Sequence, residues 1–136
     1  MDSKGASQAL NALKSAKKYN VSENANLFDL SLQNKELKYI TVNMLSRNLK
    51  LIDLQNNKLE SLPEEVSDLC FLEKLKVDHN VLKVLPYRLD KLTNLNTLTA
   101  SNNRLEFLPP SLESLEKLEI LLLNDNKIQN LPKRIG

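Results

Sequence analysis

The feature that most constrains this chain is a pattern that recurs every 23 residues from Leu49 to the end. Its consensus is LxxLxLxxNxLxxLPxxLxxLxx, with Ile, Val and one Ala replacing some leucines. Residues 27–48 fit the first half at a spacing of 22, with Lys35 at the Asn position and Thr41 at the Pro position. Because one unit recurs, one local structure is predicted to recur with it. The opening leucines, central asparagines and following prolines are Leu49, Leu72, Leu95 and Leu118; Asn57, Asn80, Asn103 and Asn126; and Pro63, Pro86, Pro109 and Pro132.

The first half of each unit has the period of a β-strand. Ile52 and Leu54 point to one side, whereas Leu51, Asp53 and Gln55 point to the other. Each unit therefore contributes one short strand, and equivalent residues of neighbouring parallel strands should lie about 4.8 Å apart. The chain has 30 leucines but only three Phe, three Tyr and no Trp, which fits a core that repeats one packing solution.

The remainder of each unit predicts a turn and a short return segment. The repeated Asn amide has two donors and an acceptor, so a column of asparagines can satisfy the turning backbone. Leu62, Val66 and Leu69 are spaced four and three residues apart, and Pro63 suits the first helical position, followed by two glutamates at the positive end. We predict a short helix or 3₁₀ segment there. The apolar slab of each unit is buried only when a neighbour stacks on it.

The segment before the repeats predicts a capping helix. Residues 6–19 form an amphipathic stripe, with Ser7 as the candidate N-cap and Ser3 as an alternative. We expect this helix to cover the exposed edge of the first repeat. The rival interpretation is a helix on a membrane surface, which would have only Ala and Leu to insert. The residues of the stripe are Ala6, Ala9, Leu10, Leu13 and Ala16.

These motifs resemble the leucine-rich-repeat family over about 110 residues, from Leu27 onward. The 23-residue unit with LP after the Asn is similar to the intracellular subclass, which includes Ras-binding scaffolds and phosphatase-regulating proteins. The resemblance implies an α/β, right-handed solenoid with parallel strands on a concave face and helical or 3₁₀ segments on a convex face. The expected division is an N-terminal tail and cap (1–26) followed by repeats at 27–48, 49–71, 72–94, 95–117 and 118–136, the last incomplete.

Composition narrows the location and the kinds of partner. Nineteen basic and 17 acidic residues are interleaved and give a net charge of +2, which argues against a nucleic-acid surface. Cys70 is the only cysteine, so an internal disulfide is excluded and a reducing compartment fits better than secretion. The N-terminus lacks the pattern of a signal peptide, and no uncharged apolar run is long enough to span a membrane. We expect a cytoplasmic protein, although nothing here separates cytoplasm from nucleus.

Residues that could support catalysis are sparse. His79 is the only histidine, has no nucleophile or second ligand nearby in the repeat, and is expected to lie in a solvated turn. Cys70 is expected to be packed or partly exposed on the convex segment. The only glycines, Gly5 and Gly136, cannot form a phosphate-binding loop. We therefore predict no enzymatic activity, no cofactor and no metal.

The outward residues of the strands are the candidate binding surface, because the inward leucines are required by the core. Lys74 and Lys76 are expected to form a basic spot beside Asp53 and Asp78, with value in steering a partner. Ile120 and Leu122 place apolar side chains where water is expected, which is typical of an interface. The outward set is Asp29, Ser31, Gln33, Leu51, Asp53, Gln55, Lys74, Lys76, Asp78, Thr97, Thr99, Ser101, Ile120, Leu122 and Asn124.

The hypothesis is a non-catalytic module that binds another protein through this concave face, as a scaffold or regulatory part in intracellular signalling. The alternative is the targeting region of a larger signalling enzyme, such as a kinase, phosphatase or ubiquitin ligase. The end of the chain bears on both, since Leu118, Leu121 and Leu123 form an uncovered slab beside an unpaired strand. We expect either a fragment or a chain that self-associates through this end.

Overall fold

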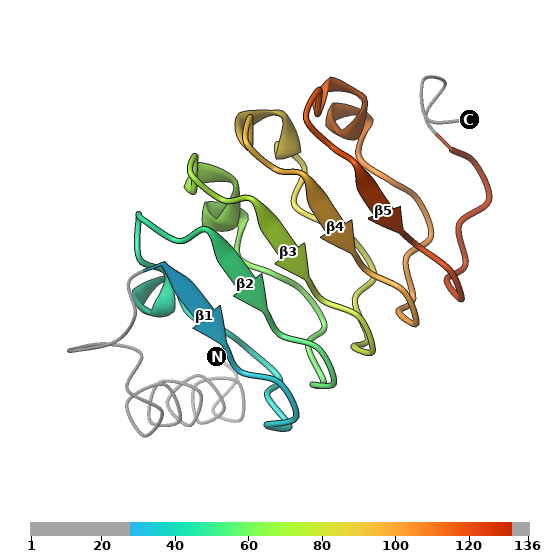
Figure 1. Ribbon diagram of the computed structural model, residues 1–136. Coiled ribbons are helices and arrows are strands. Elements are labelled where there is room, and N and C mark those ends of the chain that lie inside the picture. The colour runs from blue at the N-terminus through green and yellow to red at the C-terminus, as the bar shows by residue number, and fades with distance from the viewer. Residues whose placement is uncertain (1–27, 132–136) are drawn as a thin grey trace, which may run out of the picture.

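The computed structural model describes residues 28–131. Its elements alternate between three-residue strands and short 3₁₀ segments (Figure 1). The predicted capping helix at 6–19 lies outside the described residues. The elements in chain order are β1 (Asp29–Ser31), η1 (Val42–Met44), β2 (Leu51–Asp53), η2 (Glu64–Asp68), β3 (Lys74–Lys76), η3 (Leu89–Lys91), β4 (Thr97–Thr99), η4 (Pro110–Ser114) and β5 (Ile120–Leu122).

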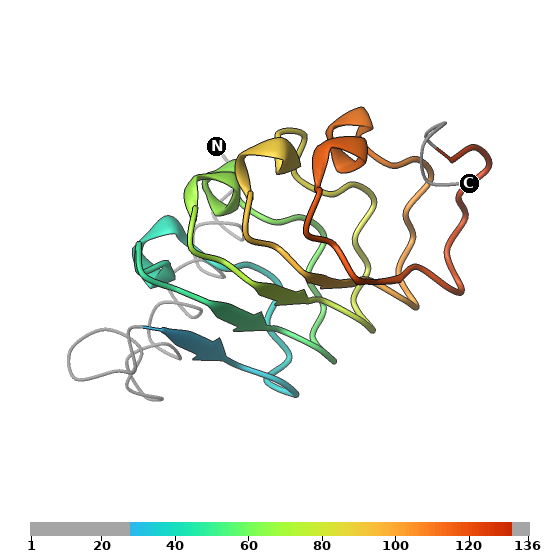
Figure 2. The same ribbon diagram turned by 45° about the horizontal axis from the view of Figure 1, so that its top comes forward.

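The five strands form one parallel sheet in chain order, β1-β2-β3-β4-β5. Leu30 pairs with Ile52, and Leu98 pairs with Leu121, so equivalent positions of successive repeats are direct neighbours. The 3₁₀ segments lie on the opposite side of the stack from the strands (Figure 2). The predicted solenoid of parallel strands and short return segments is therefore confirmed.

The space between the two sides is filled by aliphatic side chains in a single continuous core. Ile52, Leu75 and Leu98, the middle residues of the three inner strands, are completely buried. Burying one such side chain contributes about 1.5 to 3 kcal/mol, but in this fold the burial is completed by the adjacent repeat. At the last repeat the frame leucines are only partly buried: Leu118, Leu121 and Leu123.

The return segments are 3₁₀ turns. Two of them, η2 and η4, begin one residue later than the sequence predicts, whereas η3 begins three residues after Pro86. Pro63 has φ −59° and ψ 140°, so it precedes η2 as its N-cap instead of occupying the first helical position. Pro109 likewise has ψ 137° and precedes η4, whose first residue is Pro110. An extended ψ at the proline lets the chain leave the core before it turns. The two glutamates after Pro63 do lie in the first turn of η2.

Each turn after a strand contains one residue in the left-handed region, immediately before the Asn position. Without glycine, this conformation is best tolerated by Asn, Asp and His. That preference explains the otherwise isolated His79, which has φ 56°. Glu36 in the first repeat is an additional positive-φ residue, at φ 56°. The column consists of Asn34, Asn56, His79, Asn102 and Asp125.

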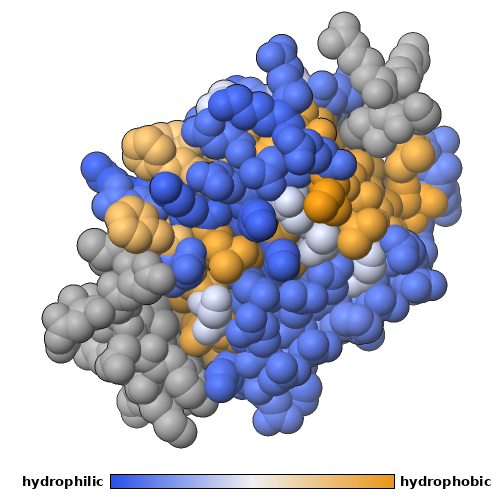
Figure 3. Space-filling view, viewed as in Figure 1, coloured by the Kyte–Doolittle hydropathy of each residue, from blue (hydrophilic) through white to orange (hydrophobic). Residues whose placement is uncertain are grey.

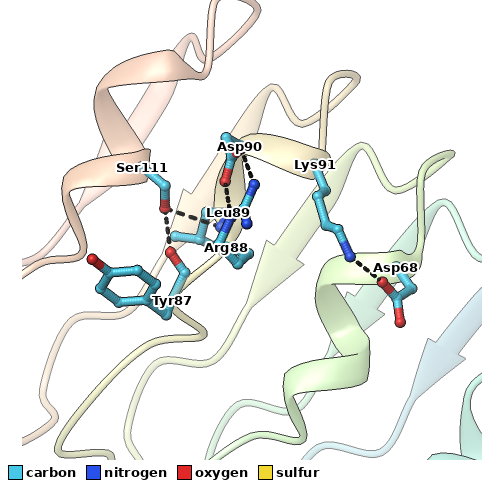
Figure 4. A network of polar contacts seen from close by, with 7 residues as sticks. All are labelled: Asp68, Tyr87, Arg88, Leu89, Asp90, Lys91 and Ser111. Carbon is cyan, nitrogen blue, oxygen red and sulfur yellow. Dashed lines mark hydrogen bonds and ion pairs between the residues drawn. The ribbon is translucent and has the colours of Figure 1, made fainter.

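Polar contacts join the 3₁₀ segments of the later repeats (Figure 4). Lys91 Nζ donates to Asp68 Oδ1 at 2.7 Å, between η3 and η2. Ser111 Oγ donates to the Tyr87 carbonyl at 2.6 Å and accepts from the Leu89 N–H at 3.0 Å, which links η4 to η3. The second, third and fourth repeats are therefore tied together on the convex side.

Candidate functional surface

The outward residues of the sheet lie in three rows that run across the repeats. Strand register sets two of the rows, and backbone hydrogen bonds beyond the strands, such as Leu54 N–H to the Lys76 carbonyl at 2.8 Å, continue the ladder into the third. The predicted set is thus brought together on one face, which we call the concave face. The rows are Asp29, Leu51, Lys74, Thr97 and Ile120; Ser31, Asp53, Lys76, Thr99 and Leu122; and Gln33, Gln55, Asp78, Ser101 and Asn124.

The two inner carboxylates of this face are held by neutral donors. Asp53 accepts from Gln33 Nε2 at 2.7 Å and from Gln55 Nε2 at 3.0 Å. Asp78 accepts from the Thr99 hydroxyl at 2.6 Å and from the Ser101 N–H at 2.8 Å. Both aspartates are buried in spite of their outward direction. Hydrogen bonds to an ionised acceptor are among the stronger ones in proteins, so these contacts fix the rotamers of both aspartates.

The lysines of the concave face do not pair with those aspartates. Lys74 is exposed and Lys76 is half-buried. Within residues 28–131 neither takes part in an ion pair or a side-chain hydrogen bond. Lys76 does lie beside Asp53 in the strand register, but the carboxylate oxygens of both aspartates accept from Gln, Thr and backbone donors instead. The ammonium groups of Lys74 and Lys76 therefore supply the positive charge of the concave face at β3.

The outward side chains of the β4 part of the face are buried. They are Thr97, Thr99 and Ser101. Short side chains between the longer ones of β3 and β5 are covered by their neighbours. Ser101 Oγ also donates to Asn124 Oδ1 at 3.3 Å, which connects the face to the last repeat.

The β5 end of the face is apolar. Ile120 and Leu122 are each 47% exposed, whereas Leu51 on β2 is half-buried. Figure 3 shows hydrophobic surface gathered over the β5 end, separated from the other end by hydrophilic residues. Leu51 is thus a single partly covered side chain, and Ile120 and Leu122 form an adjacent pair on one strand.

Below the face, the repeated asparagines bridge each repeat to the one before it. Asn103 Oδ1 accepts from the Leu82 N–H at 3.0 Å, and its Nδ2 donates to the Val77 and Ala100 carbonyls at 3.0 Å each. Asn57, Asn80 and Asn126 make equivalent contacts. Where Lys35 replaces the first Asn, its own N–H donates to Asn57 Oδ1 at 3.0 Å.

The remaining candidates for chemistry are separate from one another. His79 and Cys70 are both exposed, on the turn and the convex segment respectively. The described residues hold no group of three or more His, Cys, Asp or Glu side chains arranged to bind a metal. They also contain no helix that is both long enough and apolar enough to cross a bilayer.

A parallel sheet with one strand per repeat of 22 or 23 residues, asparagine bridges from the later turns to the preceding repeat and a leucine core define the leucine-rich-repeat fold. The chain has the fold of that class, whose repeats generally take part in protein interaction. The Leucine Rich Repeat family model matches residues 48–69 and 94–115.

Comparison with solved structures agrees with this assignment. A leucine-rich-repeat protein of Leptospira interrogans is 38% identical over 65% of this chain, with a TM-score of 0.64. The match covers 23% of the Leptospira chain, so the present chain spans less than a quarter of that protein's length. A search of the curated proteins finds no match.

Proposed function

We propose that this chain binds a protein partner through its concave face and acts as a scaffold or regulatory module in intracellular signalling. The proposal rests on a contrast between two sets of side chains on the concave face. Its carboxylates are occupied by internal donors, whereas Lys74, Lys76, Ile120 and Leu122 have no equivalent internal role. A rigid sheet displays these side chains with little ordering cost on association.

The arrangement selects the chemistry of the partner. The basic pair is on β3 and the apolar pair is on β5, two strand spacings away, or about 10 Å. A matching partner segment therefore carries an Asp or Glu about that distance from an aliphatic or aromatic side chain. The basic pair would speed the encounter, and the apolar pair would slow dissociation. The signalling role itself rests on the resemblance to intracellular leucine-rich-repeat scaffolds.

The test is quantitative affinity capture with three variants of the full chain. We expect the double change Lys74→Glu and Lys76→Glu, and separately Leu122→Asp, to weaken capture of the same partner at least about tenfold. The matched control reverses Lys83 and Lys127, which are exposed lysines outside the concave face. If the concave variants capture the wild-type set undiminished, or if the control loses it equally, the concave face is not the binding site.

A further inference from the structure

Two aromatic residues of the first repeats occupy positions that the repeat leaves polar elsewhere. Phe71 has Asn48, Asn94 and Lys117 as its equivalents in the other units. The equivalents of Phe28 are Lys50, Glu73, Asn96 and Glu119. Both rings are about half exposed, at 50% and 51%. Because the repeat does not require an aromatic ring at either position, the core does not explain them.

These residues border a groove on the side of the molecule between the first and second repeats. The groove has a volume of about 670 Å³ and meets a second hollow of about 300 Å³, with Asn48 and Phe71 contributing to both. Phe28 lines the second hollow, where Lys50 Nζ lies 5.7 Å from the centre of its ring. The apolar walls of the larger groove are Val42, Leu45, Leu69 and Phe71.

The groove has a cause in the sequence. The first repeat is one residue shorter than the others, and its return segment η1 has three residues where η2 has five. The later return segments pack on one another and are tied by polar contacts. Among the described residues, no hydrogen bond or ion pair joins 41–48 to 63–71. Packing therefore closes the convex side only partly at the junction of the first two repeats, where Val42 is 48% exposed.

We propose that this groove is the docking site for the chain's own residues 6–19, inserted through Leu10 and Leu13. Twenty-seven residues precede Phe28, so the segment joins the repeats at the rim of the groove itself. Residues 20–27 extended span about 26 Å, and a helix of residues 6–19 is about 21 Å long, so the reach is sufficient. Alanines on either side of the two leucines let a helix approach closely.

Charge does not decide the occupant. The wall of the groove carries Glu65 and Asp68 but also Arg47, and Asp68 is already paired with Lys91. On a helix, Lys14 and Lys18 would flank the apolar stripe of the segment, whereas Lys17 would lie on it. A 14-residue helix is marginal by itself in water, so its apolar face needs a partner surface. Docking on this side differs from a cap laid over the edge of β1, because it places Leu10 against η1, η2 and Phe71.

The only cysteine of the chain provides the test, because Cys70 lines the groove and is exposed. In the full chain carrying Leu10→Cys, mild oxidation should close an intrachain disulfide with Cys70, seen as a monomer of altered mobility on non-reducing gels. The matched control is Asn11→Cys, which points about 100° away around a helix. Failure of Leu10→Cys to close, or equally rapid closure of Asn11→Cys, would overturn the proposal.

A second measurement needs no new cysteine. Leu10→Asp with Leu13→Asp should raise the rate of Cys70 labelling by a thiol reagent about tenfold, because the shielding segment is released. Gln8→Asp with Asn11→Asp, off the apolar stripe, should leave the rate unchanged. Thermal unfolding of each variant checks that the repeats remain folded. Equal labelling rates in the folded wild type and in the folded Leu10 and Leu13 variant would show that the segment does not cover the groove.

Discussion

At the scale of single residues, the asparagine column stabilises the fold through hydrogen bonds to the backbone of adjacent repeats. Asn103 satisfies one backbone N–H and two carbonyls in two different repeats, and it is buried. The sequence predicts this role, since a side-chain amide at a fixed place in a repeating turn has few other uses. The neighbouring left-handed positions were not predicted, although their residues, Asn, His and Asp, carry the signal.

We expect Asn103→Ala to lower the free energy of unfolding by about 1 to 3 kcal/mol, because it strands buried backbone groups. Asn126→Ala should cost less, since Asn126 makes similar bonds but is only half-buried in the last repeat. Urea unfolding followed by circular dichroism measures both. Equal losses for the two variants would contradict a role that depends on burial.

The concave aspartates show where residue-level prediction fails. Their positions on the face follow from strand alternation, and the structure places them there. Their partners do not follow, because Lys76 and Thr99 come within reach through neighbouring strands and Gln55 along the same segment as Asp53. Only the three-dimensional packing selects among them. Asp78, for example, accepts from Thr99 rather than from a lysine.

At the scale of elements, the strands were predictable and the return segments only partly so. A period-two apolar pattern with 23-residue spacing fixes which residues pair across the sheet. The 3₁₀ turns depend on local choices that differ between units, such as Thr41 in place of proline or the shortened η1. For this reason the gap between the first two repeats is visible only in the structure.

The 3₁₀ segment η3 offers a prediction about pH. Arg88 donates to both carboxylate oxygens of Asp90, at 3.1 and 3.0 Å, and this hydrogen bonding lowers the pKa of Asp90 below its ordinary 3.8 (Figure 4). A depressed folded-state pKa stabilises the fold above the ordinary value, and the contribution is lost as the pH falls through the lowered one. Because the pair lies on the surface, the effect on stability should be slight.

Arg88→Gln should therefore move the pKa of Asp90 upward, toward its ordinary value. A carboxyl titration of Asp90 by nuclear magnetic resonance measures this shift, and Lys91→Gln serves as the comparison because its closer partner is Asp68. An unchanged Asp90 titration in Arg88→Gln would contradict the hydrogen-bonded pair.

At the scale of the whole molecule, the last repeat is the least buried part of the stack among the described residues. Leu108 is 5% exposed, whereas its equivalent in the last repeat, Leu131, is 53% exposed. Together with the edge of β5 that pairs with no further strand within residues 28–131, this surface supports the prediction of self-association through the last repeat. The sequence does not identify a binding partner, because packing in the core constrains the inward residues but not the outward ones.

We expect the sedimentation coefficient of the chain to rise with protein concentration, and Leu131→Lys to reduce that rise by placing a charge in the apolar contact. Lys74→Glu alters the concave face on the interior strand β3 instead of the last repeat and is the comparison variant. A chain that sediments as a monomer throughout the concentration range would contradict association by this end.

The order of the strands has a consequence for how such a molecule changes its length. Within residues 28–131 each strand pairs with the strands of the adjacent repeats, and inter-repeat hydrogen bonds such as Asn80 to the Leu54 carbonyl join residues 26 apart in sequence. Duplication or loss of one 23-residue unit between Leu72 and Leu95 would therefore present each remaining repeat with the same kind of neighbour on either side. A gene encoding this chain can therefore gain or lose whole repeats, because each repeat packs the same apolar positions against its neighbour.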